Sequence, residues 1–338
     1  MKWRYILSLI IIAPVISNLL FGAIRISNAV VLILLIGTWG CFTLLIREAT
    51  YLKGYVAAFF LGLALAASEE LIIQQTSLAP LIGQTAEQVY SRKWDVNWLY
   101  LLWALGYESV WVVLVPIQLI TIIFPESRSI PWVGNVGRIV FALIVIVASL
   151  VAWYSWTQIL IPQQFPNSKY TPSALQIGIS ILTIATLIAL GIRNGKQVTN
   201  HKEIPIPTPT FLLFLSFILC FLFCSLVIIS YGAIQQLPAL IPLVSGSVII
   251  IFSVNRLITW SSSTRWDVKH RLAIITGALY ANMLVGFGVF ILSNVPFFSV
   301  DFIGKIVLNL AAAIGLEWLR RNSQRSQNEP QQLTQGAG

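Results

Sequence analysis

Long apolar segments alternate with short polar breaks along almost the whole chain of 338 residues. A helix needs about 20 mostly apolar residues to cross a bilayer, and ten segments reach that length. We therefore predict an all-α polytopic integral membrane protein with about ten transmembrane helices. The predicted spans are 4–24, 28–46, 54–75, 97–124, 138–160, 174–192, 209–232, 238–260, 271–293 and 298–319.

The breaks between the spans are too short to hold a separate folded domain. Residues 1–321 are therefore predicted to form a single transmembrane helical domain. Lys2 and Arg4 give the first segment the basic start of a signal peptide, but its long apolar run favours a retained helix. Residues 322–338 are rich in Gln, Ser and Asn, which predicts a polar, disordered cytoplasmic tail.

The basic residues gather on one side of the predicted bundle. If the N-terminus is cytoplasmic and ten spans alternate, the cytoplasmic segments hold 16 of the 21 Lys and Arg residues and the opposite segments hold five. Cytoplasmic loops are enriched in positive charge, so we predict that both termini are cytoplasmic (N-in/C-in). The plasma (inner) membrane of a prokaryote is the expected location.

Composition supports the membrane assignment and narrows the chemistry. Hydrophobic residues make up 57% of the chain and charged residues 10%, whereas about a quarter of a soluble domain is charged. Topology and anionic lipid account for the net charge of +9, so the lipid bilayer is the expected partner and nucleic acid is not. The three cysteines lie in apolar segments and the two histidines in connecting segments, so neither a metal nor a cofactor is expected.

Polar residues interrupt the third predicted span before it ends. Glu69, Glu70 and Gln74 follow an apolar run that starts at Tyr55. Residues at every fourth position from Ala58 through Glu70 to Gln74 share one helix face, and the small residues among them let another helix approach closely. Glu69 lies about 100° around the helix from Glu70, so the two carboxylates are expected to point in different directions.

The fourth predicted span carries a matching stripe that includes Asn97, Glu108 and Trp111. Glu108 lies roughly 16 Å along the helix axis from Asn97, near the middle of a hydrocarbon core about 30 Å thick. Pro116 is expected to kink the helix and to free a backbone carbonyl near Val112. Spans three and four are consecutive and antiparallel, so their stripes are predicted to face each other.

These residues are predicted to line one polar pocket that opens to the outside and takes a small molecule and protons. The candidate site comprises Glu69, Glu70, Gln74, Asn97, Tyr107, Glu108 and Trp111. A charge at this depth costs a few kcal/mol, so at least one glutamate is expected to be protonated at neutral pH and able to exchange its proton. Two alternatives stay open: hydrated glutamates on a shorter third span, and a purely structural partner for Glu108.

Other polar residues within the spans have simpler interpretations. Arg256 is expected to extend from its span to the interface. Asp301 and Lys305 are four residues apart at the start of the last span, which predicts a local interfacial pair.

Two resemblances to known families follow from these patterns. Ten spans with both termini inside look like the drug/metabolite transporter architecture, which implies two halves of five spans in inverted orientation. The resemblance is one of plan, and the candidate acids all fall in the first half. The pair Glu69–Glu70 resembles the glutamate pair of the CAAX-processing membrane protease family, written EExxxR and followed by histidines in later spans. Here Gln74 stands at the Arg position and no predicted span holds a histidine, so proteolysis is not expected.

Three classes of function fit the sequence. We interpret the chain as a proton-linked secondary transporter of a small solute, because acids and amides converge without the nucleophiles or metal ligands that an enzyme usually needs. One alternative is an intramembrane acid/base enzyme acting on lipid or peptide. The other is a non-catalytic membrane scaffold or assembly factor.

Overall fold

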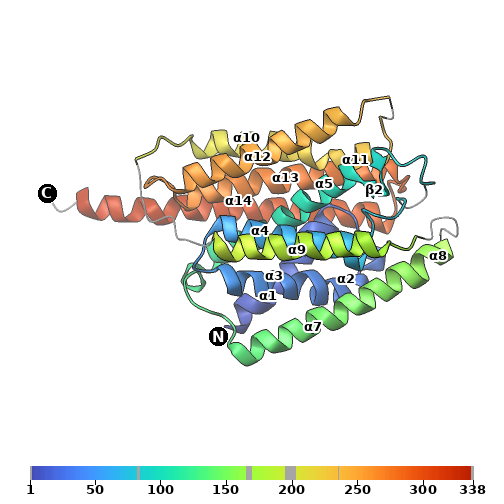
Figure 1. Cartoon of the computed structure of the whole chain (residues 1–338). Coiled ribbons are helices and arrows are strands. Elements are labelled where there is room, and N and C mark those ends of the chain that lie inside the picture. The colour runs from blue at the N-terminus through green and yellow to red at the C-terminus, as the bar shows by residue number, and fades with distance from the viewer. Residues whose placement is uncertain (1, 82–83, 165–169, 195–202, 235, 336–338) are drawn as a thin grey trace.

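Ten helices long and apolar enough to cross a membrane are found in the described part of the chain, as the sequence predicts. The computed structural model describes residues 2–81, 84–164, 170–194, 203–234 and 236–335, apart from the side chains of 163–164 and 324–335. The protein is therefore an all-α polytopic integral membrane protein. The described chain begins and ends on the same side of the bundle, called here the terminal end (Figure 1).

Five spans contain a π-helical stretch, and these are the first five in the chain. Their elements are α1 (Trp3–Pro14) with η1 (Val15–Leu20); α2 (Val31–Leu35), η3 (Ile36–Gly40) and α3 (Cys41–Thr50); α4 (Tyr55–Ser68) with η4 (Glu69–Ile73); α5 (Trp98–Tyr107), η5 (Glu108–Leu114) and α6 (Val115–Ile123); and α7 (Asn135–Trp153) with η7 (Tyr154–Leu160). A π turn places residues i and i+5 in register and is often found at functional sites.

The other five spans are α-helical. They are α9 (Ala174–Arg193), α10 (Pro209–Cys224) with α11 (Leu226–Ser230), α12 (Leu240–Ser261), α13 (Val268–Leu292) and α14 (Val300–Gln335). Short elements complete the fold: the 3₁₀ turns η2 (Ile26–Asn28) and η6 (Pro125–Ser127), the helix α8 (Ile161–Gln164), and an antiparallel pair of strands, β1 (Arg92–Lys93) and β2 (Val96–Asn97).

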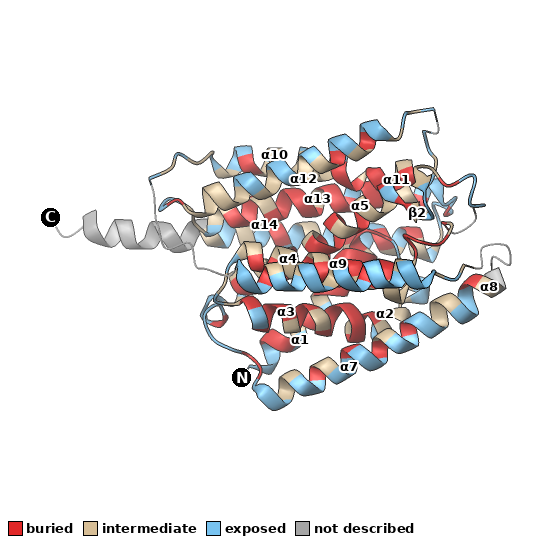
Figure 2. Cartoon of the chain, viewed as in Figure 1, coloured by how far each residue is buried: buried red, intermediate tan, exposed pale blue. Residues whose placement is uncertain are grey.

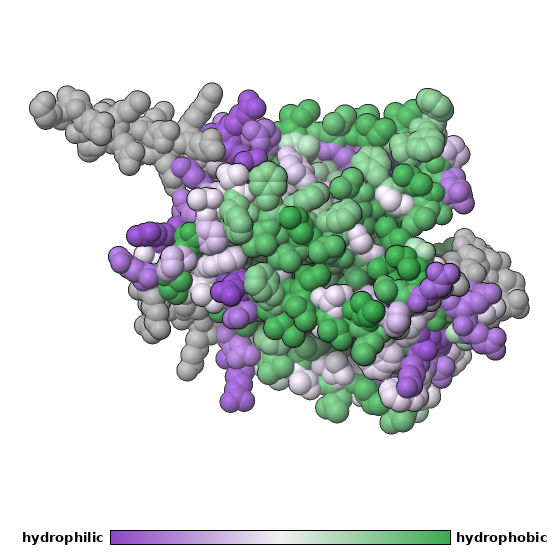
Figure 3. Space-filling view, turned by 90° about the horizontal axis from the view of Figure 1, so that it is seen from above, coloured by the Kyte–Doolittle hydropathy of each residue, from purple (hydrophilic) through white to green (hydrophobic). Residues whose placement is uncertain are grey.

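The spans divide into a central group and a peripheral group. In spans one to four and nine, 56–72% of the residues in the apolar stretch of the span are buried, against 11–28% in spans five to eight and ten. Figure 2 shows this contrast between the buried α13 and the exposed faces of α7 and α9. Apolar side chains cover the middle of the face in Figure 3, and hydrophilic ones lie toward both ends. The exposed apolar faces of the peripheral spans are therefore suited to lipid.

Burial does not follow a five-plus-five repeat. Such a repeat would make the first span equivalent to the sixth and the third span equivalent to the eighth. However, 56% of the residues in the apolar stretch are buried in the first and third spans, against 11% in the sixth and eighth. The first three spans of each half therefore differ in burial, whereas the last two spans of each half are similar.

Asp301 and Lys305 do not form the local pair that the sequence predicts. Asp301 accepts hydrogen bonds from the backbone N–H and the hydroxyl of Ser27, at 2.8 and 3.0 Å. The Lys305 ammonium group donates to the carbonyls of Leu20 and Phe21, at 2.9 and 3.1 Å. The prediction is wrong because the segment between spans one and two packs on α14 and offers both residues better partners.

The predicted disordered tail also needs correction. α14 continues to Gln335, well beyond residue 322. Glu317 pairs with Arg320 and Arg321, each at 3.1 Å, and ion pairs at these spacings stabilise a helix. Gln, which occurs five times between Gln324 and Gln335, also has high helix propensity. Residues 336–338 of the predicted tail lie outside the described residues.

Candidate functional site

Spans three and four pack directly against each other, as their matching stripes predict. A Cβ atom on Gly62 of α4 would lie 3.0 Å from the Ser109 Cα atom in η5. Such a close approach requires glycine at this point. Glu69 and Glu70 lie at the start of the π stretch η4, and Glu108 lies at the start of η5, so both acidic segments have local π geometry.

Glu69 and Glu70 are buried, each with only 3% of its surface exposed. They are therefore not the hydrated residues that a shorter third span would give. The Gln74 side-chain amide donates to Glu69 Oε1 at 2.6 Å, and the Ser77 hydroxyl donates to Glu70 Oε2 at 2.8 Å. The sequence places Gln74 with Glu70 instead. This prediction for Gln74 is wrong because η4 is a π turn, which aligns residue i with residue i+5 rather than with residue i+4.

Ser77 reaches Glu70 because the chain reverses after η4. Gln75 adopts a left-handed backbone conformation, with φ of 60°, and its carbonyl accepts hydrogen bonds from the N–H groups of Leu78 and Ala79. This turn folds the segment back over the helix end. The reversal thus supplies a hydroxyl donor to a carboxyl group that a straight helix would leave facing its neighbours.

Asn97 is buried and holds this reversed segment in place. Its side-chain amide donates to the carbonyls of Thr76 and Ala79, at 2.8 and 2.5 Å, and its backbone N–H donates to the Ser77 carbonyl at 2.8 Å. Arg92 donates to Asn97 Oδ1 at 2.6 Å. Asn97 therefore positions Ser77, and through it Glu70, rather than lining a pocket with Glu108.

Glu108 is 4% exposed, and its Oε2 atom is buried without a hydrogen-bond partner. All three carboxyl groups that the sequence places in the site are therefore buried, in a packed interior rather than in an open pocket. Among the described residues, no group of three or more His, Cys, Asp and Glu side chains is arranged to hold a metal ion.

Tyr107 and Trp111 face away from the glutamates. The Tyr107 hydroxyl contacts the Ser17 carbonyl at 2.7 Å and Asn282 Oδ1 at 3.0 Å, and the Trp111 indole N–H donates to the Ala278 carbonyl at 3.2 Å. The two rings stack with centroids 5.0 Å apart. Both residues therefore fasten span four to spans one and nine, and they lie outside the acidic cluster.

The Val112 carbonyl, which Pro116 is expected to free, accepts a hydrogen bond from another span. The Thr43 hydroxyl of span two donates to the Val112 carbonyl at 3.0 Å. Proline has no N–H to offer the preceding turn, so a neighbouring span satisfies this carbonyl. Thr43 is a partner that the sequence pattern does not reveal, because nothing marks it apart from other threonines in apolar segments.

Two buried arginines hold neighbouring segments together in a way that the sequence pattern does not predict. Arg47 donates to Glu48 Oε1 at 2.6 Å and to the carbonyl of Ser127 at 2.6 Å. Arg271 donates to Gln118 Oε1 at 2.7 Å and to the Thr121 hydroxyl at 2.8 Å. The sequence marks both only as basic residues at span ends, where they contribute to the charge asymmetry.

No protein-family model, no curated protein and no solved structure matches the chain. The likeness to the drug/metabolite transporters thus remains one of plan, and the likeness to the CAAX-processing proteases one of two residues.

Proposed function

We propose that the protein is a proton-linked secondary transporter of a small solute. The observation that carries this proposal is Glu108, buried in span four with an unpartnered carboxyl oxygen, while Glu69 and Glu70 of span three are also buried. An isolated ionised carboxylate is costly to bury, and the described residues place no salt bridge on any of the three. At least one proton is therefore expected in the cluster at neutral pH.

A proton held in this way must be released when the protein changes conformation. Gln74 and Ser77 bind Glu69 and Glu70 and belong to the segment that leads out of span three, toward the end of the bundle opposite the terminal end. Movement of this segment would expose the two carboxyl groups to water at that end. The π stretches η4 and η5 give both spans a place where backbone hydrogen bonds can rearrange.

The proposed orientation places the terminal end in the cytoplasm of a prokaryote, at its plasma membrane. The distribution of 16 against five basic residues supports it, because positive charge is retained on the cytoplasmic side. The proton route from the glutamates would then lead to the outer face.

An intramembrane acid/base enzyme receives less support. Among the residues that the structure describes, no glutamate lines the apolar cavity between α10 and α12. A lipid or peptide in this cavity would not meet the three carboxyl groups. The proposal also does not rest on a symmetric repeat, since the two halves of the chain are buried to different extents.

The test uses the full chain in proteoliposomes that contain a pH-sensitive dye. Classes of small solute are added one at a time, with and without an imposed pH gradient. A solute that moves protons in the wild type should move none in Glu108→Gln. Glu126→Gln is the matched control, because Glu126 is an exposed glutamate that pairs with Arg4 away from the cluster.

Solute flux that is unaffected by collapsing the gradient would contradict proton linkage. Full proton coupling in Glu108→Gln would contradict the role of this residue. If no solute class moves although the protein is folded, transport itself is rejected, and a scaffold or enzyme becomes the better description.

A further inference from the structure

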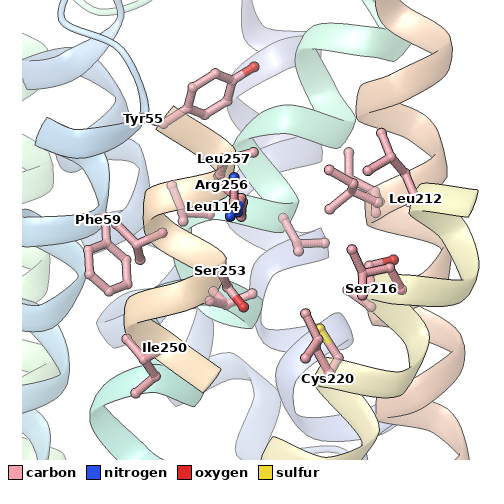
Figure 4. A pocket seen from close by; sticks show the side chains of 18 of the residues that line it. Tyr55, Phe59, Leu114, Leu212, Ser216, Cys220, Ile250, Ser253, Arg256 and Leu257 are labelled. Atoms are coloured by element: carbon pink, nitrogen blue, oxygen red, sulfur yellow. The ribbon is translucent and has the colours of Figure 1, made fainter. Parts of the chain in front are cut away.

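A cavity of about 200 Å³ lies between the peripheral helices α10 and α12, and none of the three glutamates is among its described lining residues. Its walls come from α4, α5, η5, α6, α10, α12 and α13. Figure 4 shows Leu212, Ser216 and Cys220 of α10 on one side of it, and Ile250 and Ser253 of α12 on the other. Since α10 and α12 are peripheral spans, the cavity is next to the lipid.

The length of the cavity matches one leaflet of a bilayer. On α12 its lining runs from Ile249 to Trp260, and on α10 from Leu212 to Phe223, which is about 16 Å of helix in each case. Half of a hydrocarbon core about 30 Å thick is close to this length. The lining is almost entirely apolar away from the terminal end, so its chemistry suits a hydrocarbon chain.

The polar groups of the cavity gather at the terminal end. Arg256 lies near the end of α12 and Arg271 near the start of α13, together with Gln118, Trp260 and Trp266. No Asp or Glu lines the described cavity. Its two guanidinium groups therefore face an apolar space without a carboxylate to balance them.

Arg271 and Trp266 retain unused hydrogen-bond donors. Arg271 is 7% exposed and binds only the neutral groups of Gln118 and Thr121 through one nitrogen, while its Nε atom is buried without a partner. The indole nitrogen of Trp266 is also buried without a partner. Buried donors usually have an acceptor, and an acidic group at this end of the cavity would supply one.

We propose that this cavity binds one anionic lipid. An acyl chain lies between α10 and α12, and the acidic headgroup accepts hydrogen bonds from Arg271 and Arg256 at the terminal end. Basic pockets between transmembrane helices recognise acidic headgroups in this way. The apolar length of the cavity distinguishes a lipid from a free anion, and the two arginines distinguish an anionic lipid from a neutral one.

The test places the full chain in nanodiscs that contain equal amounts of phosphatidylglycerol and phosphatidylcholine with the same acyl chains. Native mass spectrometry then measures which lipid stays bound. Phosphatidylglycerol should be retained over phosphatidylcholine. Arg256→Gln and Arg271→Gln should each weaken this preference by about tenfold, the loss expected for one hydrogen bond to a charged group.

Ser253→Phe tests the hydrocarbon part, because it fills the cavity without removing a charge; it should also abolish retention. This variant and Arg256→Gln keep the test decisive if Arg271→Gln fails to fold. Arg193→Gln is the control, since Arg193 is an exposed basic residue at the end of α9, outside the cavity, and it should change nothing.

Equal retention of the two lipids, or a preference that survives all three cavity variants, would overturn the proposal. A separate arm adds inorganic phosphate to the protein in neutral detergent and follows thermal unfolding. Stabilisation by phosphate equal to that by phosphatidylglycerol would identify a small-anion site and would also overturn it. None of these outcomes depends on Glu108 or on proton transport.

Discussion

The Gln74 amide donates to the Glu69 carboxyl group five residues earlier in the chain, at 2.6 Å. In a regular α-helix these two side chains would lie on different faces. The π turn between them brings them together, and the Ser77 hydroxyl donates to Glu70 instead. The local backbone geometry therefore decides which donor each glutamate receives.

Loss of this donor should destabilise the fold. Gln74→Ala leaves a buried carboxyl oxygen without its partner, which costs about 1–3 kcal/mol. Thermal unfolding in detergent would show a lower midpoint than the wild type. Gln158→Ala is the control, because Gln158 is exposed on η7, and it should have little effect. Equal midpoints for the two variants would mean that the contact contributes nothing.

Gly62 sets the distance between the two acidic spans. Gly62→Ala places a methyl group 3.0 Å from the Ser109 Cα atom, so the helices must separate, and such overpacking costs about 1–3 kcal/mol. Gly178→Ala on α9 meets open space and should instead stabilise by about 0.5–1 kcal/mol, because alanine favours the helix. Opposite shifts of the unfolding midpoint are expected, and a stabilised Gly62→Ala would contradict the close packing.

Asp267 caps α13 and should make stability depend on pH. Burial by itself would raise its pKa, but hydrogen bonds from the backbone N–H and the ring of His270, at 3.1 and 2.5 Å, outweigh burial and hold the pKa of Asp267 below its usual value. A lowered folded pKa gives stability that is complete above the unfolded pKa, about 4, and is lost as the pH falls through the folded pKa.

The variants at this position separate the cap from the charge. Asp267→Ala should lose about 1 kcal/mol at neutral pH, and its deficit relative to the wild type should shrink below about pH 4. Asn is also a good N-cap residue, so Asp267→Asn should keep most of the cap but not this pH dependence. Unfolding measured from pH 3 to pH 7 checks both, and a deficit that is constant with pH would argue against the carboxylate.

Arg47 and Glu48 form a buried ion pair whose side chains are 1% and 2% exposed. Arg47→Met would remove the closer of the two basic partners of the buried Glu48 carboxylate, and breaking a buried ion pair costs about 3–5 kcal/mol. The Arg4–Glu126 pair is exposed on both sides, so Arg4→Met should have a small effect. Chemical unfolding curves of both variants test the difference, and a mild Arg47→Met would mean that Arg138, 3.6 Å from Glu48, replaces the lost charge.

The ten spans and the packing of spans three and four follow from apolar length and from small residues at every fourth position, both of which depend on general helix geometry. The sequence also predicts Glu69, Glu70 and Glu108 inside the bundle, where all three are buried. The sequence pattern misplaces Gln74 because it implies 3.6 residues per turn throughout the span, whereas η4 is a π turn. No residue type clearly marks a π turn in a sequence. The role of Asn97 depends on a chain reversal at Gln75, which span patterns do not describe.

Each of the first five spans contains a π stretch, and so accommodates a residue that an uninterrupted α-helix would not. Deleting one residue there would let the span close into regular α geometry and still cross the bilayer. Because the wider π turn takes up the extra residue, the segments on either side of the deletion would keep nearly the same faces. In these five spans a one-residue deletion within the π stretch is therefore expected to leave most neighbours of the flanking segments unchanged, whereas the same deletion in a regular α-helix would rotate everything beyond it by about 100°.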